Sequence, residues 1–147
     1  MYKYIIILLA LTITSCCGLH TEITYNYKDT VIKRVDECGK STFYYSDINK
    51  NAIRIWAEYS GINDGFSGYL KFEDNGKVLL LSGDGYFQTA NKDTSKFEYK
   101  RIIAAQRPTL GKSVYFISLS TRYEKERNLD TNTDVKVIYN IDDNEWY

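Results

Sequence analysis

An Asn-Gly pair between two strand-like runs is the feature that most constrains the fold of this chain. Residues 66–74 alternate apolar and polar side chains, and after Lys77 an apolar run follows at residues 78–81. Asn75 and Gly76 separate the two runs. An Asn-Gly pair in that setting is the strongest short-range signal for a β-hairpin, because both residues accept the positive φ angles of a tight turn. We therefore predict an antiparallel hairpin here.

The turn also predicts the register of this hairpin. With two residues in the turn, three cross-strand pairs follow: Asp74 with Lys77, Phe72 with Leu79, and Leu70 with Leu81. The four apolar members of these pairs would share one face, which we expect to belong to the core. The opposite face is mixed, since it contains Tyr69, Lys71 and Glu73 together with Val78 and Leu80. In a closed barrel that second face, with Ile102, would line a cavity.

Composition extends the prediction to the whole chain. Its 147 residues include 14 Tyr, 6 Phe and 2 Trp but only one Pro, and aromatic and β-branched residues fit a pleated, half-buried surface. Further strands are predicted at residues 41–46, 52–60, 86–89, 97–104, 113–123 and 134–141. Residues 31–37 and 122–127 suit a turn or two of helix at most. We expect an all-β fold, an antiparallel sandwich or a barrel of meander hairpins, with a lipocalin-like barrel as one version.

The organisation of the chain is simple. No internal repeat and no internal linker is visible, so residues 29–147 form one predicted domain, preceded by a tether at residues 16–28. The 19 basic and 19 acidic residues balance. The chain therefore lacks the basic footprint of a nucleic-acid-binding protein.

The first fifteen residues have the design of a signal peptide. A basic start at Lys3 precedes an apolar run at residues 5–11, which is shorter than the roughly 20 residues of a transmembrane helix. The following segment, LTITSC at residues 11–16, resembles the lipobox of bacterial lipoproteins. The resemblance implies cleavage after residue 15, lipid on Cys16, and a lipid-anchored position in the cell envelope facing the periplasm. A plain cleaved signal peptide and a structural strand are the alternatives.

The remaining cysteines and the acidic loops predict no metal or cofactor. Cys17 and Cys38 could form a disulfide or stay as two thiols. Neither has the close ligand partners that zinc needs. Residues 47–58 begin like a calcium loop, but Ala52 stands where that loop needs glycine.

Catalysis also has little support in the sequence. The sole histidine, His20, falls in the predicted tether, away from any nucleophile of the domain. A carboxylate-based hydrolase would need two acidic side chains facing each other across a cleft. The candidates are Glu58, Asp64, Glu73 and Asp84, and nothing in the sequence pairs any two of them. We therefore predict that the protein is not an enzyme.

Two kinds of residue are candidates for ligand binding. Trp56 and Tyr69 alternate with polar residues, so each either packs on a cross-strand neighbour or stacks on a ligand. Residues 82–86, SGDGY, with Lys100 downstream, loosely resemble a pattern of membrane-bound lysozyme inhibitors. That resemblance implies that Ser82 and Lys100 engage the catalytic carboxylates of a lysozyme. The chain lacks the tryptophan before the lysine and the glycine after it, and a Gly-rich turn explains the same residues.

These observations predict a lipid-anchored envelope protein with a non-catalytic binding role. Its partners would be the membrane, through the lipid, and either a small apolar or glycan ligand or another envelope protein. The alternative function is inhibition of a lysozyme-like wall hydrolase. The candidate residues are Cys16 for lipidation and Trp56, Tyr69, Ser82 and Lys100 for ligand binding.

Overall fold

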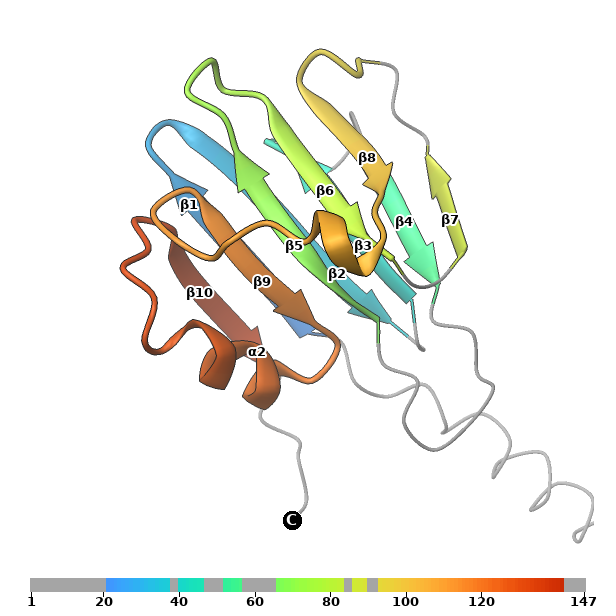
Figure 1. Ribbon diagram of the computed structural model, residues 1–147. Coiled ribbons are helices and arrows are strands. Elements are labelled where there is room, and N and C mark those ends of the chain that lie inside the picture. Colours follow the sequence, from blue (N-terminus) through green and yellow to red (C-terminus); the bar gives the residue numbers. More distant parts are fainter. Residues whose placement is uncertain are drawn as a thin grey trace, which may run out of the picture.

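Two β-sheets packed face to face and one short α-helix make up the part of the chain that the structure, a computed structural model, describes (Figure 1). That part comprises residues 21–37, 40–46, 52–56, 66–83, 86–89 and 93–141. Its elements in chain order are β1 (Thr21–Tyr27), β2 (Thr30–Glu37), β3 (Lys40–Tyr45), β4 (Ala52–Trp56), β5 (Ser67–Phe72), β6 (Val78–Ser82), β7 (Tyr86–Thr89), β8 (Phe97–Arg101), η1 (Ala104–Gln106), β9 (Val114–Ser118), α2 (Thr121–Asn128) and β10 (Lys136–Ile141).

The two sheets differ in how they are built. The larger sheet has the order β10-β1-β2-β3-β4-β7, in which β1 to β4 form an antiparallel meander. The smaller sheet has the order β8-β6-β5-β9. Its β6 and β8 are parallel, because the chain leaves for the larger sheet at β7 and returns. The described residues form no closed barrel, so the fold is the predicted all-β sandwich rather than the barrel alternative.

The main core lies between the sheets. Successive residues of a strand point to opposite faces, so alternate residues of both sheets meet there. Aromatic rings contact each other across this core. Tyr25 faces Tyr115 and Tyr27 faces Phe72, with ring centroids 5.6 and 5.4 Å apart. The buried members are Ile23, Tyr25, Tyr27, Ile32, Phe43, Ile53, Phe66, Leu70, Phe72, Val78, Leu80, Phe97, Tyr115, Ile117 and Val135.

The β1 and β2 strands correct two predictions. The tether expected at residues 16–28 is wrong from Thr21 onward, because β1 lies inside the larger sheet, paired with both β10 and β2. The helical turn expected at residues 31–37 is the strand β2. In β1 the inward positions are Ile23, Tyr25 and Tyr27, an alternation that is visible in the sequence.

The strand predicted at residues 113–123 is too long, while the short helix predicted at residues 122–127 is confirmed. The strand β9 ends at Ser118, and α2 begins at Thr121. The side-chain oxygen of Ser120 accepts a hydrogen bond from the backbone N–H of Tyr123 (3.3 Å). Serine before a helix stabilises its first turn in this way, so Ser120 sets the start of α2.

The hairpin at Asn75 and Gly76 is confirmed, but its register is shifted by one residue. Phe72 pairs with Val78 and Leu70 with Leu80. The N–H of Gly76 donates to the carbonyl oxygen of Glu73 (3.0 Å), and Gly76 has φ +81°. Three residues rather than two therefore make the turn, which is the type that ends in a left-handed glycine.

This shift exchanges the two faces of β6, because side chains alternate along a strand. Val78 and Leu80, expected on the mixed face, belong to the main core. Leu79 and Leu81, expected in that core, point to the outer face of the smaller sheet. There they form a second apolar cluster with Tyr69, Val114 and Phe116.

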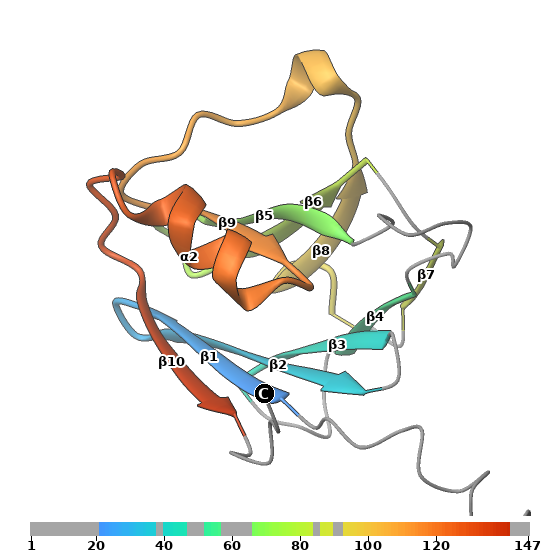
Figure 2. The same cartoon turned by 90° about the horizontal axis from the view of Figure 1, so that it is seen from below.

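The segment after β8 covers part of this outer face. In Figure 2 it arches over the smaller sheet, on the side away from the larger sheet, and carries the turn η1. Ile102 and Leu110 from this segment pack against the second apolar cluster. The smaller sheet is therefore covered by the larger sheet on one face and partly by this loop on the other.

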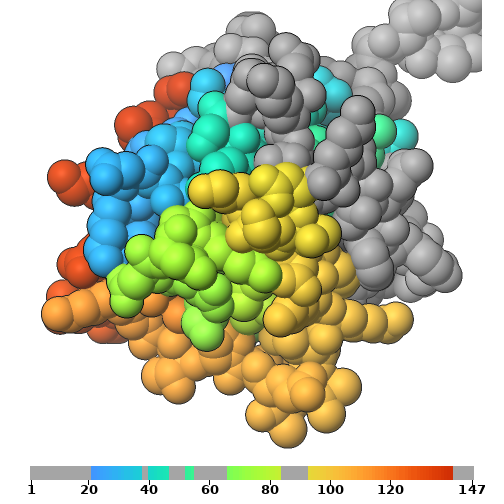
Figure 3. Space-filling view, turned by 90° about the horizontal axis from the view of Figure 1, so that it is seen from above, coloured from blue at the N-terminus to red at the C-terminus, as the bar shows by residue number. Residues whose placement is uncertain are grey.

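At one end of the sandwich, turns of the two sheets lie against each other. Figure 3 looks onto this end, where the blue β1–β2 turn touches the lime-green β5–β6 turn. Lys28 forms an ion pair with Asp74 (2.7 Å), and the hydroxyl of Tyr45 donates to the carbonyl oxygen of Gly76 (2.7 Å). These contacts connect the sheets at the end opposite to α2.

Candidate functional site

A cavity of about 410 Å³ opens on the outer face of the smaller sheet, between the loop after β8 and the helix α2. We call it the arginine cavity. Its size is within the usual range for small-molecule sites. The lining residues are Ser67, Gly68, Tyr69, Gly83, Arg101, Ile102, Ile103, Ala104, Arg107, Phe116, Tyr123 and Arg127.

Aromatic rings form one side of the arginine cavity. Tyr69 meets Phe116 edge to face, with ring centroids 5.7 Å apart, and Phe116 meets Tyr123 in the same manner at 5.3 Å. Tyr69 and Phe116 are buried, whereas Tyr123 is 47% exposed. The exposed part of this aromatic row offers a flat apolar surface of the kind on which ligand rings stack.

Three arginines border the cavity: Arg101 at the end of β8, Arg107 after η1, and Arg127 on α2. Arg101 is in register with Ser82, so its side chain leaves β8 toward the opposite face of the sheet, and Arg107 and Arg127 supply the charge of the cavity. None of the residues that line the cavity in the described part of the chain is acidic. Within the same described ranges, none of these guanidinium groups forms an ion pair. Several other surface cations do have carboxylate partners: Lys28 with Asp74, Lys77 with Glu98, and Arg122 with Glu126.

A close approach of two strands shapes the floor beside the arginines. A Cβ atom on Gly68 would lie 2.5 Å from the carbonyl oxygen of Leu81 on the neighbouring strand β6. That distance is far inside van der Waals contact, so the glycine allows β5 and β6 to pack as they do. We attribute Gly68 to this packing rather than to a ligand.

The helix α2, which carries Tyr123 and Arg127, is held by polar contacts. It has eight residues and only two buried side chains, Glu124 and Asn128, so apolar burial does little to dock it. The Asn128 amide accepts from the N–H of Phe116 (3.0 Å) and donates to the carbonyl oxygens of Phe116 (2.9 Å) and Glu124 (2.7 Å). This side chain completes hydrogen bonds of the edge strand β9 and fixes α2 against it.

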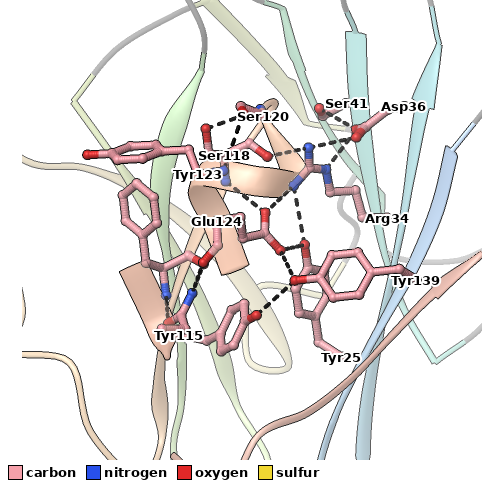
Figure 4. Close-up of polar contacts among 12 residues, drawn as sticks. Tyr25, Arg34, Asp36, Ser41, Tyr115, Ser118, Ser120, Tyr123, Glu124 and Tyr139 are labelled. Carbon is pink, nitrogen blue, oxygen red and sulfur yellow. Dashed lines mark hydrogen bonds and ion pairs between the residues drawn. The ribbon is translucent and has the colours of Figure 1, made fainter. Parts of the chain in front are cut away.

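Glu124 extends this docking into a buried network between the sheets (Figure 4). Its carboxylate accepts from the hydroxyls of Tyr25 (3.0 Å) and Tyr139 (3.2 Å) and from the N–H of Ser118 (2.8 Å). The guanidinium of Arg34 also donates to it (2.8 Å). The carboxylate thus connects α2 and β9 with β1, β2 and β10.

Arg34 is fully buried and uses every donor that it has. A guanidinium has five N–H groups. Two of them reach the carboxylate of Asp36 (2.7 and 2.6 Å), and the others reach Glu124, the Tyr25 hydroxyl (3.2 Å) and the carbonyl oxygen of Ser118 (2.8 Å). Burial of an arginine is costly unless its charge is paired in this manner.

Burial also changes the proton affinities in this network. It raises the pKa of Glu124, while the Arg34 charge and the hydrogen bonds from Ser118, Tyr25 and Tyr139 oppose that rise. Burial together with the Glu124 charge raises the pKa values of Tyr139 and Tyr115. Displaced pKa values are common at functional sites, but structural ion-pair networks produce them too. The network is closed and its members satisfy one another, so we assign it a structural role and take the arginine cavity as the candidate site.

The sequence predictions agree with this site in two residues. Tyr69, a predicted ligand-binding residue, lines the arginine cavity, and so does Ile102 from the predicted second face. The other two residues of that face, Val78 and Leu80, lie in the main core. No enclosed apolar surface therefore combines the three within the described part of the chain.

Ser82 and Lys100 are not brought together. Ser82 is buried in β6 and donates to the carbonyl oxygen of Ser67 (2.8 Å). Lys100 is in register with Leu81, so it shares the outer face of the smaller sheet, whereas Ser82 points to the opposite face. The two residues do not form the exposed pair that the resemblance to lysozyme inhibitors implies.

Most of the other candidate residues from the sequence lie outside the described part of the chain. Trp56 ends β4, opposite Lys40 and Tyr86, but its side chain lies outside the described residues. So do Cys16, Cys17, His20, Cys38, Glu58, Asp64 and Asp84, and the start of the calcium-like loop. Glu73 is half-buried beside the β5–β6 turn, away from the arginine cavity.

Sequence reasoning missed the three arginines, and only one weak signal was available for them. They belong to three separate segments, and no motif or spacing connects them. The weak signal is at Arg101, which precedes the apolar pair Ile102 and Ile103 at a predicted strand end. This arrangement places a charged group beside an apolar surface. Their convergence depends on how the loop after β8 and the helix α2 pack.

The described residues show neither a metal cluster nor a membrane-spanning helix. They contain no cluster of three or more His, Cys, Asp or Glu side chains that could hold a metal ion. No helix among them has the length and apolar character to cross a membrane. No protein-family model, curated protein or solved structure matches this chain.

Proposed function

We propose that this chain is a lipid-anchored, non-catalytic binding protein of the bacterial cell envelope, and that the arginine cavity holds its ligand. The address rests on the signal-peptide design of residues 1–15 and on the lipobox-like segment that ends at Cys16. The ligand is a small molecule that carries negative charge, with an apolar or ring-shaped part beside that charge.

The observation that carries the proposal is the set of cationic groups in the cavity that have no carboxylate partner among the described residues. Arg107 and Arg127 reach one concave surface from separate elements, and Arg101 borders that surface at the end of β8. Like charges that share a cavity repel each other, and a bound anion relieves that repulsion. Guanidinium groups also present paired donors that fit the oxygens of an anion.

The chemistry of the lining supports binding rather than catalysis. In the described chain, the residues around the cavity include no His, Cys, Asp or Glu that could act as a general base. Their reactive groups are the hydroxyls of Ser67, Tyr69 and Tyr123, and none of these has a base beside it among the lining residues. A positively charged cavity with an aromatic side suits retention of a ligand.

The binding proposal can be tested by native mass spectrometry. A soluble form that begins at Cys17 retains every described strand and would be exposed to an extract of bacterial envelopes. We expect an added mass of roughly a few hundred daltons, the size that such a cavity accommodates. The added mass should vanish in the triple variant Arg101→Gln, Arg107→Gln, Arg127→Gln, and persist in Arg122→Gln, which alters an arginine outside the cavity.

Three outcomes would count against this proposal: a bare wild-type domain, an adduct that survives in the triple variant, or an adduct of protein mass. The anchor is tested separately, by metabolic labelling with palmitate in a bacterium that processes lipoproteins. We expect label on the wild-type chain and none on Cys16→Ala. Equal labelling of both would remove the lipid anchor from the proposal.

A further inference from the structure

We propose that the charged group held by the arginine cavity is a phosphoryl ester, carried on a body about the size of one sugar ring. This inference rests on the proposed function and narrows it, since a ligand with a carboxylate would satisfy that function equally well. Charge balance, the placement of Arg127 and the shape of the cavity each support the narrower statement.

Charge balance favours a dianion. The guanidinium groups of Arg107 and Arg127 bring two positive charges to a cavity with no acidic side chain among its described lining residues. A single carboxylate neutralises one of these charges. A phosphate monoester carries about −1.5 to −2 at neutral pH and has three strong acceptor oxygens, so it can pair with more than one guanidinium. Arginine forks match phosphate oxygens in bidentate geometry.

Arg127 is already positioned for such a contact. Its guanidinium carbon lies 5.5 Å from the centre of the Phe116 ring, an arrangement that holds the side chain over the aromatic face. The helix that carries it is fixed by Glu124 and Asn128 on its buried side. A side chain that is held in place loses less conformational entropy on binding, which favours affinity.

The shape of the cavity limits the body of the ligand. At about 410 Å³ the cavity lies near the lower end of the range for small-molecule sites. Tyr123 stands 47% exposed on one side, where its ring can stack on the apolar face of a sugar. Ile103, on the opposite loop, is 66% exposed. Together they form apolar walls beside the charged group.

The same chemistry exists in two forms, a soluble sugar phosphate and the headgroup of phosphatidic acid. Both present a phosphate monoester on a polyol. The experiment therefore uses isothermal titration with glucose 6-phosphate, glucuronate and glucose, and a sedimentation assay with vesicles of phosphatidylcholine that contain or lack phosphatidic acid. The protein is the soluble form that begins at Cys17, compared with Arg107→Gln, Arg127→Gln and the control Arg122→Gln.

We expect glucose 6-phosphate to bind at least about tenfold more tightly than glucuronate, and glucose not to bind measurably. Each of Arg107→Gln and Arg127→Gln should weaken glucose 6-phosphate binding about tenfold, the effect of losing one charge-assisted pair. Arg122→Gln should not change it. Sedimentation with vesicles that contain phosphatidic acid, reversed by glucose 6-phosphate, would assign the lipid headgroup. Binding of glucose 6-phosphate without sedimentation would assign a soluble source.

Glucuronate binding as tightly as glucose 6-phosphate would overturn the phosphoryl inference but leave the proposed anion-binding function intact. Failure of every anion to bind would overturn both. An affinity for glucose 6-phosphate that is equal in Arg107→Gln, Arg127→Gln and wild type would also overturn the inference, because the phosphate would then be held elsewhere.

Discussion

Arginine side chains are buried and paired in one region of this molecule, and exposed without an ion pair among the described residues in another. In the network between the sheets, Arg34 is fully buried and all five of its N–H groups have protein acceptors. In the arginine cavity, Arg101, Arg107 and Arg127 are exposed, and within the described residues they have no carboxylate partner. The same side chain is saturated in one region and open in the other.

The difference separates structural charge from available charge. A buried guanidinium must be paired inside the protein, because an uncompensated charge in the core costs several kcal/mol. An exposed guanidinium costs little when unpaired, so its partner can come from outside. Substitutions in the first region should therefore change stability, and substitutions in the second should change affinity. The helix α2 belongs to both regions, through Glu124 and Arg127.

The largest effect is expected for Glu124→Gln. The amide of glutamine would place a donor among four existing donors and would leave Arg34 with Asp36 as its single negative partner. Breaking a buried ion pair costs roughly 3–5 kcal/mol. We expect urea unfolding of the soluble form to show a loss of that order. Glu126→Gln, on the exposed side of the same helix, is the matched control and should leave the midpoint unchanged. Equal stability of the two variants would contradict the structural role of the network.

A smaller loss is expected for Asn128→Ala. The substitution removes three hydrogen bonds and leaves the N–H and carbonyl oxygen of Phe116 without their partners on α2. Each unsatisfied buried group costs about 1–3 kcal/mol. Hydrogen exchange of the Phe116 amide should accelerate along with the loss of stability. Because α2 also carries Arg127, ligand affinity should fall as well. A change in exchange without any change in affinity would show that the two regions are uncoupled.

Alkaline pH tests the network without a mutation. The pKa values of Tyr25, Tyr115 and Tyr139 are raised in the folded chain, chiefly by burial. The folded state therefore keeps these protons when the unfolded state begins to lose them, above about pH 10. Stability from these groups is complete below that pH and is lost as the pH rises further. Tyrosinate absorbance should show a group of tyrosines that ionises only on unfolding, and fewer of them in Tyr139→Phe. Uniform ionisation in the folded state would contradict the prediction.

The smallest effect on stability is expected for Arg107→Ala. Its side chain is exposed and makes no ion pair among the described residues, so the urea midpoint should match that of wild type. The substitution should instead lower ligand affinity about tenfold, and the size of this loss should depend on the salt concentration. The measurement is the titration described for the phosphoryl ligand. A destabilised Arg107→Ala variant with unchanged affinity would reverse the assignment of the two regions.

The fold class and most strands could be predicted because they depend on local alternation and turn residues. The β5–β6 hairpin and the strand Tyr86–Thr89 are examples. It was harder to predict which face of each strand is buried. In residues 31–37, Val31 and Val35 share one face and Ile32 and Arg34 the other, and hydropathy favours the valine side. The protein buries Ile32 and Arg34 instead, because Glu124, distant in sequence, neutralises the arginine.

Of the residues around the candidate site, the sequence analysis singled out only Tyr69 and Ile102, because the other contacts depend on residues that are distant in sequence. The arginines are brought to the cavity by long-range packing. The loop after β8 packs on Leu79 and Leu81, and α2 packs on β9. A single residue in the turn at Gly76 decides whether those leucines face outward. No local pattern in the sequence specified that extra residue, so neither the second apolar cluster nor the loop above it could be foreseen.

The strand β6 has a consequence for how the chain emerges during synthesis. All five of its residues, Val78–Ser82, are buried, so it needs apolar cover on both sides. Apart from Tyr69, the cover for Leu79 and Leu81 comes from Ile102, Leu110, Val114 and Phe116, all of which are made later. Until those residues have emerged, the nascent chain presents an uncharged, strand-forming run to any neighbour, and such runs pair readily with one another. The run therefore needs protection while the chain is being made, although it is fully buried in the folded domain.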